Sequence, residues 1–304
     1  MMNGIKASWL EQIGQPGKYR YSQSLKLIKK FSHPEFEGEW YLQANGPGTF
    51  QRVLLICPPE LSQPVPAVAV PFYFPEAMLG FEPDTDEKLP RYAGIEMMLH
   101  LVRRGFIAAS ADAFHLTYLM SDRTRGDWER WADASCALLR DHPGWTGIGK
   151  LTADTKLLVD VLANDARVNA ERIGIAGHSL GGKMAFYAGC LDDRIKVILA
   201  SDFGIGWDQT NWSDLWYWGE KVEKLKTLGM DHSGLLGCAA PKPFCLLAGQ
   251  YDNEDSWKMM CNAPGYKEND QRLVIVNHAT GHRPPPNALQ TGYDFLSRWL
   301  EKPQ

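Results

Sequence analysis

The pentapeptide Gly177-His178-Ser179-Leu180-Gly181 is the stretch of this 304-residue chain with the clearest potential for chemistry. It fits the pattern G-x-S-x-G and lies between an apolar run typical of a strand and a run typical of a helix. At such a strand-to-helix turn the two glycines allow close backbone contacts, and the serine hydroxyl projects above the sheet. We therefore interpret Ser179 as a candidate nucleophile. The alternative is a glycine-rich turn whose serine only caps the helix.

A serine hydroxyl is a weak nucleophile, so this interpretation requires a general base and an acid that orients it. Where the nucleophile lies on this kind of turn, the chain order is serine, then carboxylate, then histidine. Two histidines follow the last predicted strand, His278 and His282. We favour His282, because the loop containing Gly281 could carry it over Ser179, whereas His278 lies directly at the strand end.

The predicted acid is Asp252, which follows the apolar run FCLLAG. Catalytic side chains collect in loops at the carboxyl ends of parallel strands. Glu254 and Asp255 are close enough in the chain to replace it. Asp202, at the end of the preceding strand, is a further alternative.

An acyl-transfer site also needs N–H groups that bind a developing oxyanion. The N–H of Leu180, at the start of the predicted helix, is one candidate. The second should come from the loop after PAVAVPFYF, where the prolines have no N–H and Tyr73 is our choice over Phe72 and Phe74. The glycine-rich H-G-G-G segment found in many lipases is absent from this sequence.

The elements that must position these residues follow from the hydrophobic pattern. Apolar runs alternating with helical patterns predict a mostly parallel sheet covered by helices on both faces, the α/β class, with antiparallel strands at its N-terminal edge. The predicted strands are Ser24–Phe31, Glu39–Gln43, Phe50–Cys57, Pro66–Phe74, Phe106–Asp112, Arg172–Gly177, Ile195–Ser201, Phe244–Gly249 and Arg272–Asn277. The predicted helices are Ala93–Arg104, Asp127–Leu139, Thr152–Asp165, Leu180–Leu191 and Ala288–Glu301.

We find no linker that divides the chain, so we expect one domain over residues 1–304 with a tryptophan-rich, cap-like insertion at about 203–240. Flat aromatic rings offer a large contact area with few torsions to fix, which suits sugar or aryl groups. Trp207 and Trp212 are therefore candidate substrate-binding residues. The alternative is that the rings of the insertion pack on one another.

Composition narrows the function classes. A net charge of −4 and a pI of about 6.1 argue against nucleic acid as a partner, because no basic surplus exists to neutralise phosphates. We see no apolar run long enough for a membrane helix and no secretory signal. Six scattered cysteines predict neither a disulfide framework nor a zinc site. We therefore expect a cytoplasmic protein without metal or cofactor; the sequence does not indicate an oligomeric state.

Three stretches carry a resemblance to a known family: DWERW (127–131), GWTGIGKLTADTKLLVDVL (144–162) and ERIGIAGHSLGGKMAFYAGCLDDRIKVILASD (171–202). They resemble α/β-hydrolases of the dienelactone-hydrolase and acetyl-xylan-esterase-like group. The resemblance implies the α/β-hydrolase fold and a triad of Ser179, Asp252 and His282. Dienelactone hydrolases use a cysteine nucleophile, so the serine here favours an esterase.

Lys183, four residues after Ser179, matches a second resemblance. In glucuronoyl esterases a lysine at this offset binds the acidic sugar, which makes Lys183 a candidate substrate-binding residue. That family carries an arginine where this chain has Leu180, so the match is partial. The alternative is a solvated lysine on a helix.

These observations predict a serine carboxylic-ester hydrolase that works through an acyl-enzyme, on small acyl esters that include acetylated carbohydrates. The alternatives are a glucuronoyl-esterase-like enzyme, a serine peptidase of the same fold, and a binding protein that keeps the fold without catalysis.

Overall fold

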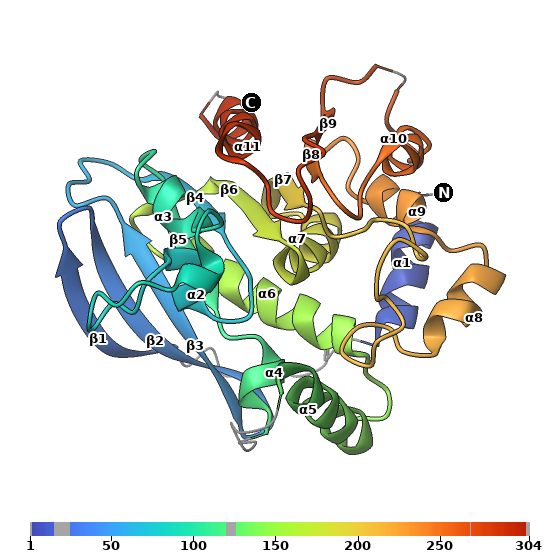
Figure 1. Ribbon diagram of the computed structural model, residues 1–304, viewed down its shortest axis with the longest axis horizontal. Coiled ribbons are helices and arrows are strands. Elements are labelled where there is room, and N and C mark those ends of the chain that lie inside the picture. Colours follow the sequence, from blue (N-terminus) through green and yellow to red (C-terminus); the bar gives the residue numbers. More distant parts are fainter. Residues whose placement is uncertain (1, 15–24, 120–125, 268, 302–304) are drawn as a thin grey trace.

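The computed structural model describes residues 2–14, 25–119, 126–267 and 269–301, and it is built on one nine-stranded sheet (Figure 1). The strand order is β1-β2-β3-β5-β4-β6-β7-β8-β9. The strands are β1 Leu25–His33, β2 Phe36–Gly46, β3 Thr49–Cys57, β4 Val65–Ala69, β5 Ile107–Ala111, β6 Val168–His178, β7 Ile195–Ser201, β8 Phe244–Ala248 and β9 Leu273–Asn277.

The pairing of the strands agrees with the predicted fold class. Strands β1, β2 and β3 pair antiparallel, and β3 pairs antiparallel with β5. From β5 to β9 every neighbouring pair is parallel. The predicted mostly parallel sheet with an antiparallel N-terminal edge is therefore confirmed; of the predicted first strand, Ser24 lies outside the described residues. The strand predicted at Pro66–Phe74 ends at Ala69, shortly before Pro71, which has no N–H to donate to a neighbouring strand.

Helices cover both faces of the sheet (Figure 1). One apolar cluster joins a face of the sheet to α6 and α7, through residues such as Leu158 and Met184. A second cluster joins the other face to α3 and α11, through Met98 and Leu296. The helices are α1 Met2–Ile13, α2 Pro75–Leu79, α3 Met97–Val102, α4 Phe114–Thr117, α5 Asp127–Asp141, α6 Gly147–Ala163, α7 Leu180–Leu191, α8 Lys221–Thr227, α9 His232–Gly237, α10 Glu254–Cys261 and α11 Pro286–Leu300, with a short 3-10 helix, η1, at Pro90–Tyr92.

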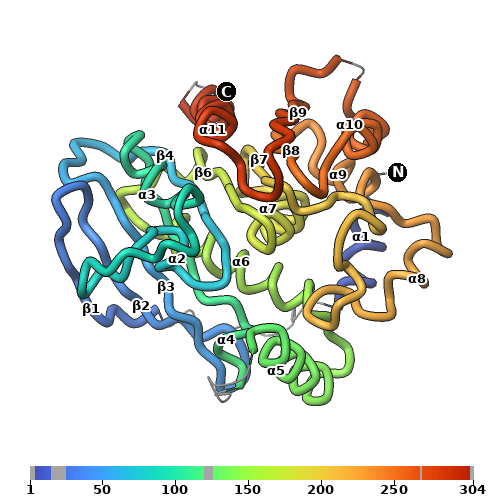
Figure 2. The backbone as a smooth tube through the Cα atoms, viewed as in Figure 1, coloured from blue at the N-terminus to red at the C-terminus, as the bar shows by residue number. Residues whose placement is uncertain are grey.

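The Trp-rich segment, residues 203–240, connects β7 to β8 and contains α8 and α9. Figure 2 shows that α1, near the N-terminus, lies beside this segment. Trp9 of α1 stacks on the ring of His232, 5.9 Å between centroids, and on Trp207 at 6.3 Å. The rings of the Trp-rich segment therefore form an aromatic core of their own, which α1 closes.

None of the helices within the described ranges combines the length and the apolar character that a membrane-spanning helix requires.

Candidate active site

Ser179 occupies a one-residue turn between β6, which ends at His178, and α7, which begins at Leu180. Its backbone has φ 57° and ψ −117°, a conformation that residues with a side chain rarely adopt. The turn is held by the Ser179 N–H, which donates to the Ser201 carbonyl at 2.9 Å. Such strain persists only where surrounding contacts impose it, and it places the hydroxyl at the carboxyl end of the parallel strands.

Two glycines make the turn possible. A Cβ at Gly177 would lie 2.1 Å from the carbonyl oxygen of Gly181, and a Cβ at Gly181 would lie 2.1 Å from the carbonyl oxygen of Pro71. Both contacts are with backbone atoms, which cannot move aside as a flexible side chain can. The spacing G-x-S-x-G is therefore required by packing at this corner of the fold.

We expect Gly181→Ala to lower the free energy of unfolding by about 2–4 kcal/mol, because the new methyl group must displace the Pro71 backbone. Urea denaturation followed by far-UV circular dichroism measures this loss. Gly144→Ala is the matched control, since a Cβ there meets no atom within 4 Å. Equal stability of the two variants would contradict the packing argument.

His282 lies in the loop after β9, and its Nδ1 is 2.7 Å from a carboxylate oxygen of Asp202. Asp202 is fully buried, whereas the His282 side chain keeps 31% of its surface exposed. The His282 ring is flanked by His178, 4.5 Å away between centroids, and by Tyr251 at 5.1 Å. An imidazole held at Nδ1 by a carboxylate leaves Nε2 for proton transfer, which is the arrangement of a general base.

The predicted pairing of Asp252 with His282 is wrong, because Asp202 makes that contact. Asp252 is buried and accepts hydrogen bonds from the backbone N–H groups of residues 203, 204 and 205, each at 2.8 Å, and from the Ser256 hydroxyl at 2.9 Å. Its two carboxylate oxygens thus hold the loop after β7. Glu254 and Asp255, the carboxylates that follow it closely in the chain, form the first turn of α10.

Asp202 and Asp252 each accept hydrogen bonds from the backbone of the loop that contains the other. One oxygen of Asp202 accepts the N–H groups of Gly249, Tyr251 and Asp252, all in the loop after β8, while its other oxygen receives His282. Burial acts to raise the pKa of Asp202, but the hydrogen bonds from His282 and from these backbone groups outweigh it and lower the pKa. The pKa of Asp252 is raised, because burial dominates there. The pKa of Asp202 is therefore the lower of the two.

His278, the other histidine that follows the last strand, forms hydrogen bonds within a local turn. Its Nδ1 accepts from the N–H of Thr280 at 3.3 Å and lies 2.8 Å from the Thr280 hydroxyl. The His278 ring also packs against Gly249, so closely that a Cβ added at Gly249 would lie 2.5 Å from the ring. The histidine that reaches the cavity beside Ser179 is His282.

A cavity of about 530 Å³, which we call the catalytic pocket, brings the candidate residues together. Ser179, Asp202 and His282 line one part of it. The remaining described lining residues come from η1, α5, α7, the Trp-rich segment and neighbouring loops: Tyr73, Arg91, Trp128, Trp131, Lys183, Phe203, Thr210, Asn211, Asp214, Tyr217 and Tyr251.

Lys183 lines the catalytic pocket but is not solvated, since only 3% of its surface is exposed. Its Nζ donates to the Phe203 carbonyl at 2.9 Å and lies over the rings of Trp212 and Tyr217, at 4.2 and 4.8 Å from their centroids. Burial lowers the pKa of this amine to about 7. The pocket therefore contains a cation whose charge changes near neutral pH.

Trp207 and Trp212, predicted to contact substrate, are not among the described residues that line the catalytic pocket. Trp212 is fully buried and its indole N–H donates to the Gly204 carbonyl at 2.7 Å. The Trp207 indole N–H donates to the Met230 carbonyl at 3.0 Å. Both rings belong to the aromatic core of the Trp-rich segment, and Trp212 acts on the pocket only as the ring beneath Lys183.

The two predicted oxyanion donors come from separate parts of the chain. Leu180 is the first residue of α7, where N–H groups have no partner within the helix. Tyr73 lines the catalytic pocket, and its carbonyl accepts the N–H of Ala113 at 2.9 Å. In the described part of the chain, no group of three or more His, Cys, Asp or Glu side chains is arranged to hold a metal ion.

Comparisons with known proteins agree with this architecture. The family model described as "Glucuronyl esterase, fungi" matches residues 146–214, a stretch that contains Ser179, Lys183 and Asp202. YtaP of Bacillus subtilis (strain 168), provisionally named a hydrolase, is 24% identical over 181 residues, which are 50% of this chain and 54% of that protein. The aligned part therefore spans about half the length of that relative.

Solved structures match over almost the whole chain. A structure from Bacteroides fragilis, provisionally described as an acetyl xylan esterase, has a TM-score of 0.70 at 17% identity and covers 91% of this chain and 74% of its own. A glucuronoyl esterase from Solibacter usitatus has a TM-score of 0.70 at 15% identity, covering 97% and 91%. Acetyl xylan esterase 1 from a Thermoanaerobacterium species has a TM-score of 0.60 at 15% identity, covering 98% and 93%.

The predicted resemblance to the acetyl-xylan-esterase-like group is confirmed by these matches, which are to proteins described as esterases or hydrolases. With its sheet order, its serine turn and this similarity to solved structures, the chain is an α/β-hydrolase by fold.

Proposed function

We propose that this protein is a serine carboxylic-ester hydrolase whose triad is Ser179, His282 and Asp202. The observation that carries the proposal is the 2.7 Å contact between Asp202 and His282 Nδ1 in a pocket that Ser179 also lines. A buried carboxylate that holds an imidazole, in a pocket that a strained serine also lines, supports activation of the hydroxyl for acyl transfer.

In the proposed reaction the Ser179 hydroxyl attacks the ester carbonyl while His282 Nε2 takes its proton. Asp202 holds the required tautomer and stabilises the imidazolium. The N–H groups of Leu180 and Tyr73 are the proposed donors to the oxyanion. His282 then protonates the alcohol that leaves, and water repeats the two steps on the acyl-enzyme.

The proposed substrates are short acyl esters of carbohydrates, as the similar acetyl xylan esterases suggest. The test is a panel of p-nitrophenyl acetate, acetylated xylose, acetylated xylotetraose and an aminoacyl anilide, with kcat/KM as the readout. Turnover of the acetyl esters above the anilide supports an esterase over a peptidase. A protein that turns over none of them and takes no fluorophosphonate label would contradict the proposal and favour a binding protein.

A glucuronoyl ester is the second candidate substrate, and Lys183 favours it. The matched family model describes glucuronyl esterases, and its matched stretch includes this lysine. Lys183 places an N–H donor in the catalytic pocket, where it would donate to oxygens of a uronic acid ester and pair with the carboxylate of the acid product. Adding methyl glucuronate to the panel distinguishes the two substrates.

We expect glucuronate, the acid product, to inhibit more weakly as pH rises. The pKa of Lys183 is about 7, so the amine is mostly charged at pH 6 and mostly neutral at pH 8. Loss of this charge should raise the inhibition constant about tenfold over that range, since the glucuronate carboxylate stays ionised throughout. Inhibition of p-nitrophenyl acetate hydrolysis measures the effect.

The matched control for this pH dependence is Lys183→Met, which keeps the length of the side chain and removes the charge. It should bind glucuronate weakly at pH 6 and show no further tenfold change up to pH 8. Because His282 is the same in both proteins, subtracting the two profiles isolates the lysine. Identical profiles would show that Lys183 does not bind the acid.

A further inference from the structure

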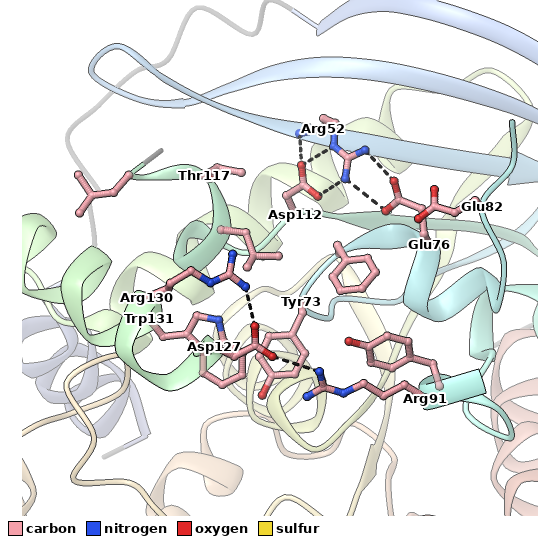
Figure 3. Close-up of a pocket in the computed structure, with 14 residues that line it drawn as sticks. Arg52, Tyr73, Glu76, Glu82, Arg91, Asp112, Thr117, Asp127, Arg130 and Trp131 are labelled. Atoms are coloured by element: carbon pink, nitrogen blue, oxygen red, sulfur yellow. Dashed lines mark hydrogen bonds and ion pairs between the residues drawn. The ribbon is translucent and has the colours of Figure 1, made fainter. Parts of the chain in front are cut away.

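A second cavity, larger than the catalytic pocket, adjoins it. It has a volume of about 850 Å³ and lies between β3, α2, α4 and the first turn of α5; we call it the outer cavity (Figure 3). Tyr73, Arg91 and Trp131 line both cavities, so the two meet across these side chains. A single ligand could therefore extend from Ser179 into the outer cavity, which the proposed chemistry does not use.

The three described arginines that line the outer cavity are each paired with a carboxylate. Arg52 contacts Glu76 at 2.7 Å and Asp112 at 2.8 Å. Asp127 bridges two further guanidinium groups, Arg91 at 3.1 Å and Arg130 at 2.5 Å, as the dashed lines in Figure 3 show. Each described arginine that lines this cavity already has a carboxylate partner, so the outer cavity does not favour an anion as the catalytic pocket does through Lys183.

The remaining lining groups suit a neutral ring that carries hydroxyl groups. Glu82 lines the cavity and forms no ion pair with a described residue, so its carboxylate can accept from hydroxyl donors. Phe74 and Tyr92 add aromatic surface. On the shared side, Trp128 in the first turn of α5 is 59% exposed at the rim of the catalytic pocket, a large apolar surface left to the solvent.

We propose that the outer cavity is a binding subsite for neutral sugar units that follow the esterified one, so that the substrate is an ester of an oligosaccharide. Paired charges together with aromatic rings match the alternating hydroxyl edges and apolar faces of a sugar chain. This inference rests on the proposed esterase function and extends it by naming where the rest of the substrate lies.

The experiment compares kcat/KM for acetylated xylose, acetylated xylotetraose and p-nitrophenyl acetate. Thr117 lines the outer cavity and not the catalytic pocket, so Thr117→Trp should fill the former; Thr291→Trp, on the exposed face of α11, is the matched control. We expect the wild type to prefer the tetraose over the monosaccharide by tenfold or more, about 1.4 kcal/mol, and Thr117→Trp to abolish this preference.

Glu82→Gln tests the same site without added bulk, with Glu87→Gln as its control on the same loop outside the cavity. We expect it to lower the ratio of tetraose to p-nitrophenyl acetate turnover about threefold to tenfold, through KM rather than kcat. A wild type that hydrolyses p-nitrophenyl acetate but shows no preference for the tetraose would overturn the subsite and leave the esterase proposal standing. Selective loss on aryl esters in Thr117→Trp would also overturn it, because the cavity would then hold an aromatic alcohol.

Discussion

Ser179→Ala should lower kcat for p-nitrophenyl acetate by a factor of about 10⁴ or more. The loss is this large because the hydroxyl oxygen itself forms the acyl-enzyme, and the remaining groups of a triad cannot replace the bond that it makes. Initial rates at saturating substrate measure the effect. A fluorophosphonate probe should label the wild-type protein once and leave the variant unlabelled.

Ser32→Ala is the matched control for this substitution, because Ser32 is exposed on β1 at the far edge of the sheet. It should retain full activity and full labelling. A Ser179→Ala variant with undiminished activity on short p-nitrophenyl esters would show that the strained turn has another role and that the proposed mechanism is wrong.

Asp202→Asn should lower kcat at neutral pH by a factor of about 10³–10⁴. Asparagine fills the same space but presents an amide where a carboxylate receives His282 Nδ1, so it favours the wrong tautomer and no longer stabilises the imidazolium. The comparison of kcat and KM with the wild type measures this effect, and we expect the loss to fall on kcat.

Asp252→Asn should be measured beside Asp202→Asn, because the comparison separates a structural carboxylate from the proposed acid of the triad. Its amide cannot accept at both oxygens from the backbone of residues 203–205, so we expect unfolding to become easier by about 2–4 kcal/mol. The folded fraction should retain kcat within about tenfold. If Asp252→Asn instead loses more kcat than Asp202→Asn, the acid of the triad is Asp252 and the histidine changes partners during turnover.

Local sequence patterns predict the turn at Ser179 and the succession of strands along the chain, because each depends on a few neighbouring residues. The turn at Ser179 requires two glycines and an adjoining strand and helix, and all of these are contiguous in the chain. The predicted bounds of β7 agree with those of the structure, since a buried parallel strand gives one short apolar run.

The aspartate that contacts His282 could not be predicted from such patterns, because two aspartates follow neighbouring parallel strands. Ser201 at the end of β7 pairs with Leu247 near the end of β8, so Asp202 and Asp252 emerge at the same edge of the sheet. Which of them meets His282 depends on the backbone of the two loops, including the positive φ of 41° at Asp202. That conformation depends on contacts between the loops and leaves no periodic signal.

Contacts between residues far apart in the chain also explain why the packing of the tryptophans and of α1 was not predicted. Ile5, Trp9 and Ile13 repeat every four residues, a helical signal in the N-terminal stretch for which we predicted no helix. The rings that Trp9 contacts, such as Tyr187, Trp207 and His232, lie more than 170 residues away in the chain. Trp207 meets Trp9 and His232, and Trp212 meets His232, only in the folded chain. An aromatic-rich sequence therefore does not reveal whether its rings face a ligand or one another.

Asp202 and Asp252 each accept hydrogen bonds from the loop that contains the other, which limits where the pocket can open to a ligand. The segment that covers one side of the pocket starts at residues 203–205, whose N–H groups are tied to Asp252 and whose carbonyls receive Lys183, Trp212 and His232. A movement of this segment about residues 203–205 would separate Asp202 from His282. We therefore expect ligands to enter and leave at the rim beside α5, where the side chains of Trp128 and Arg91 are exposed.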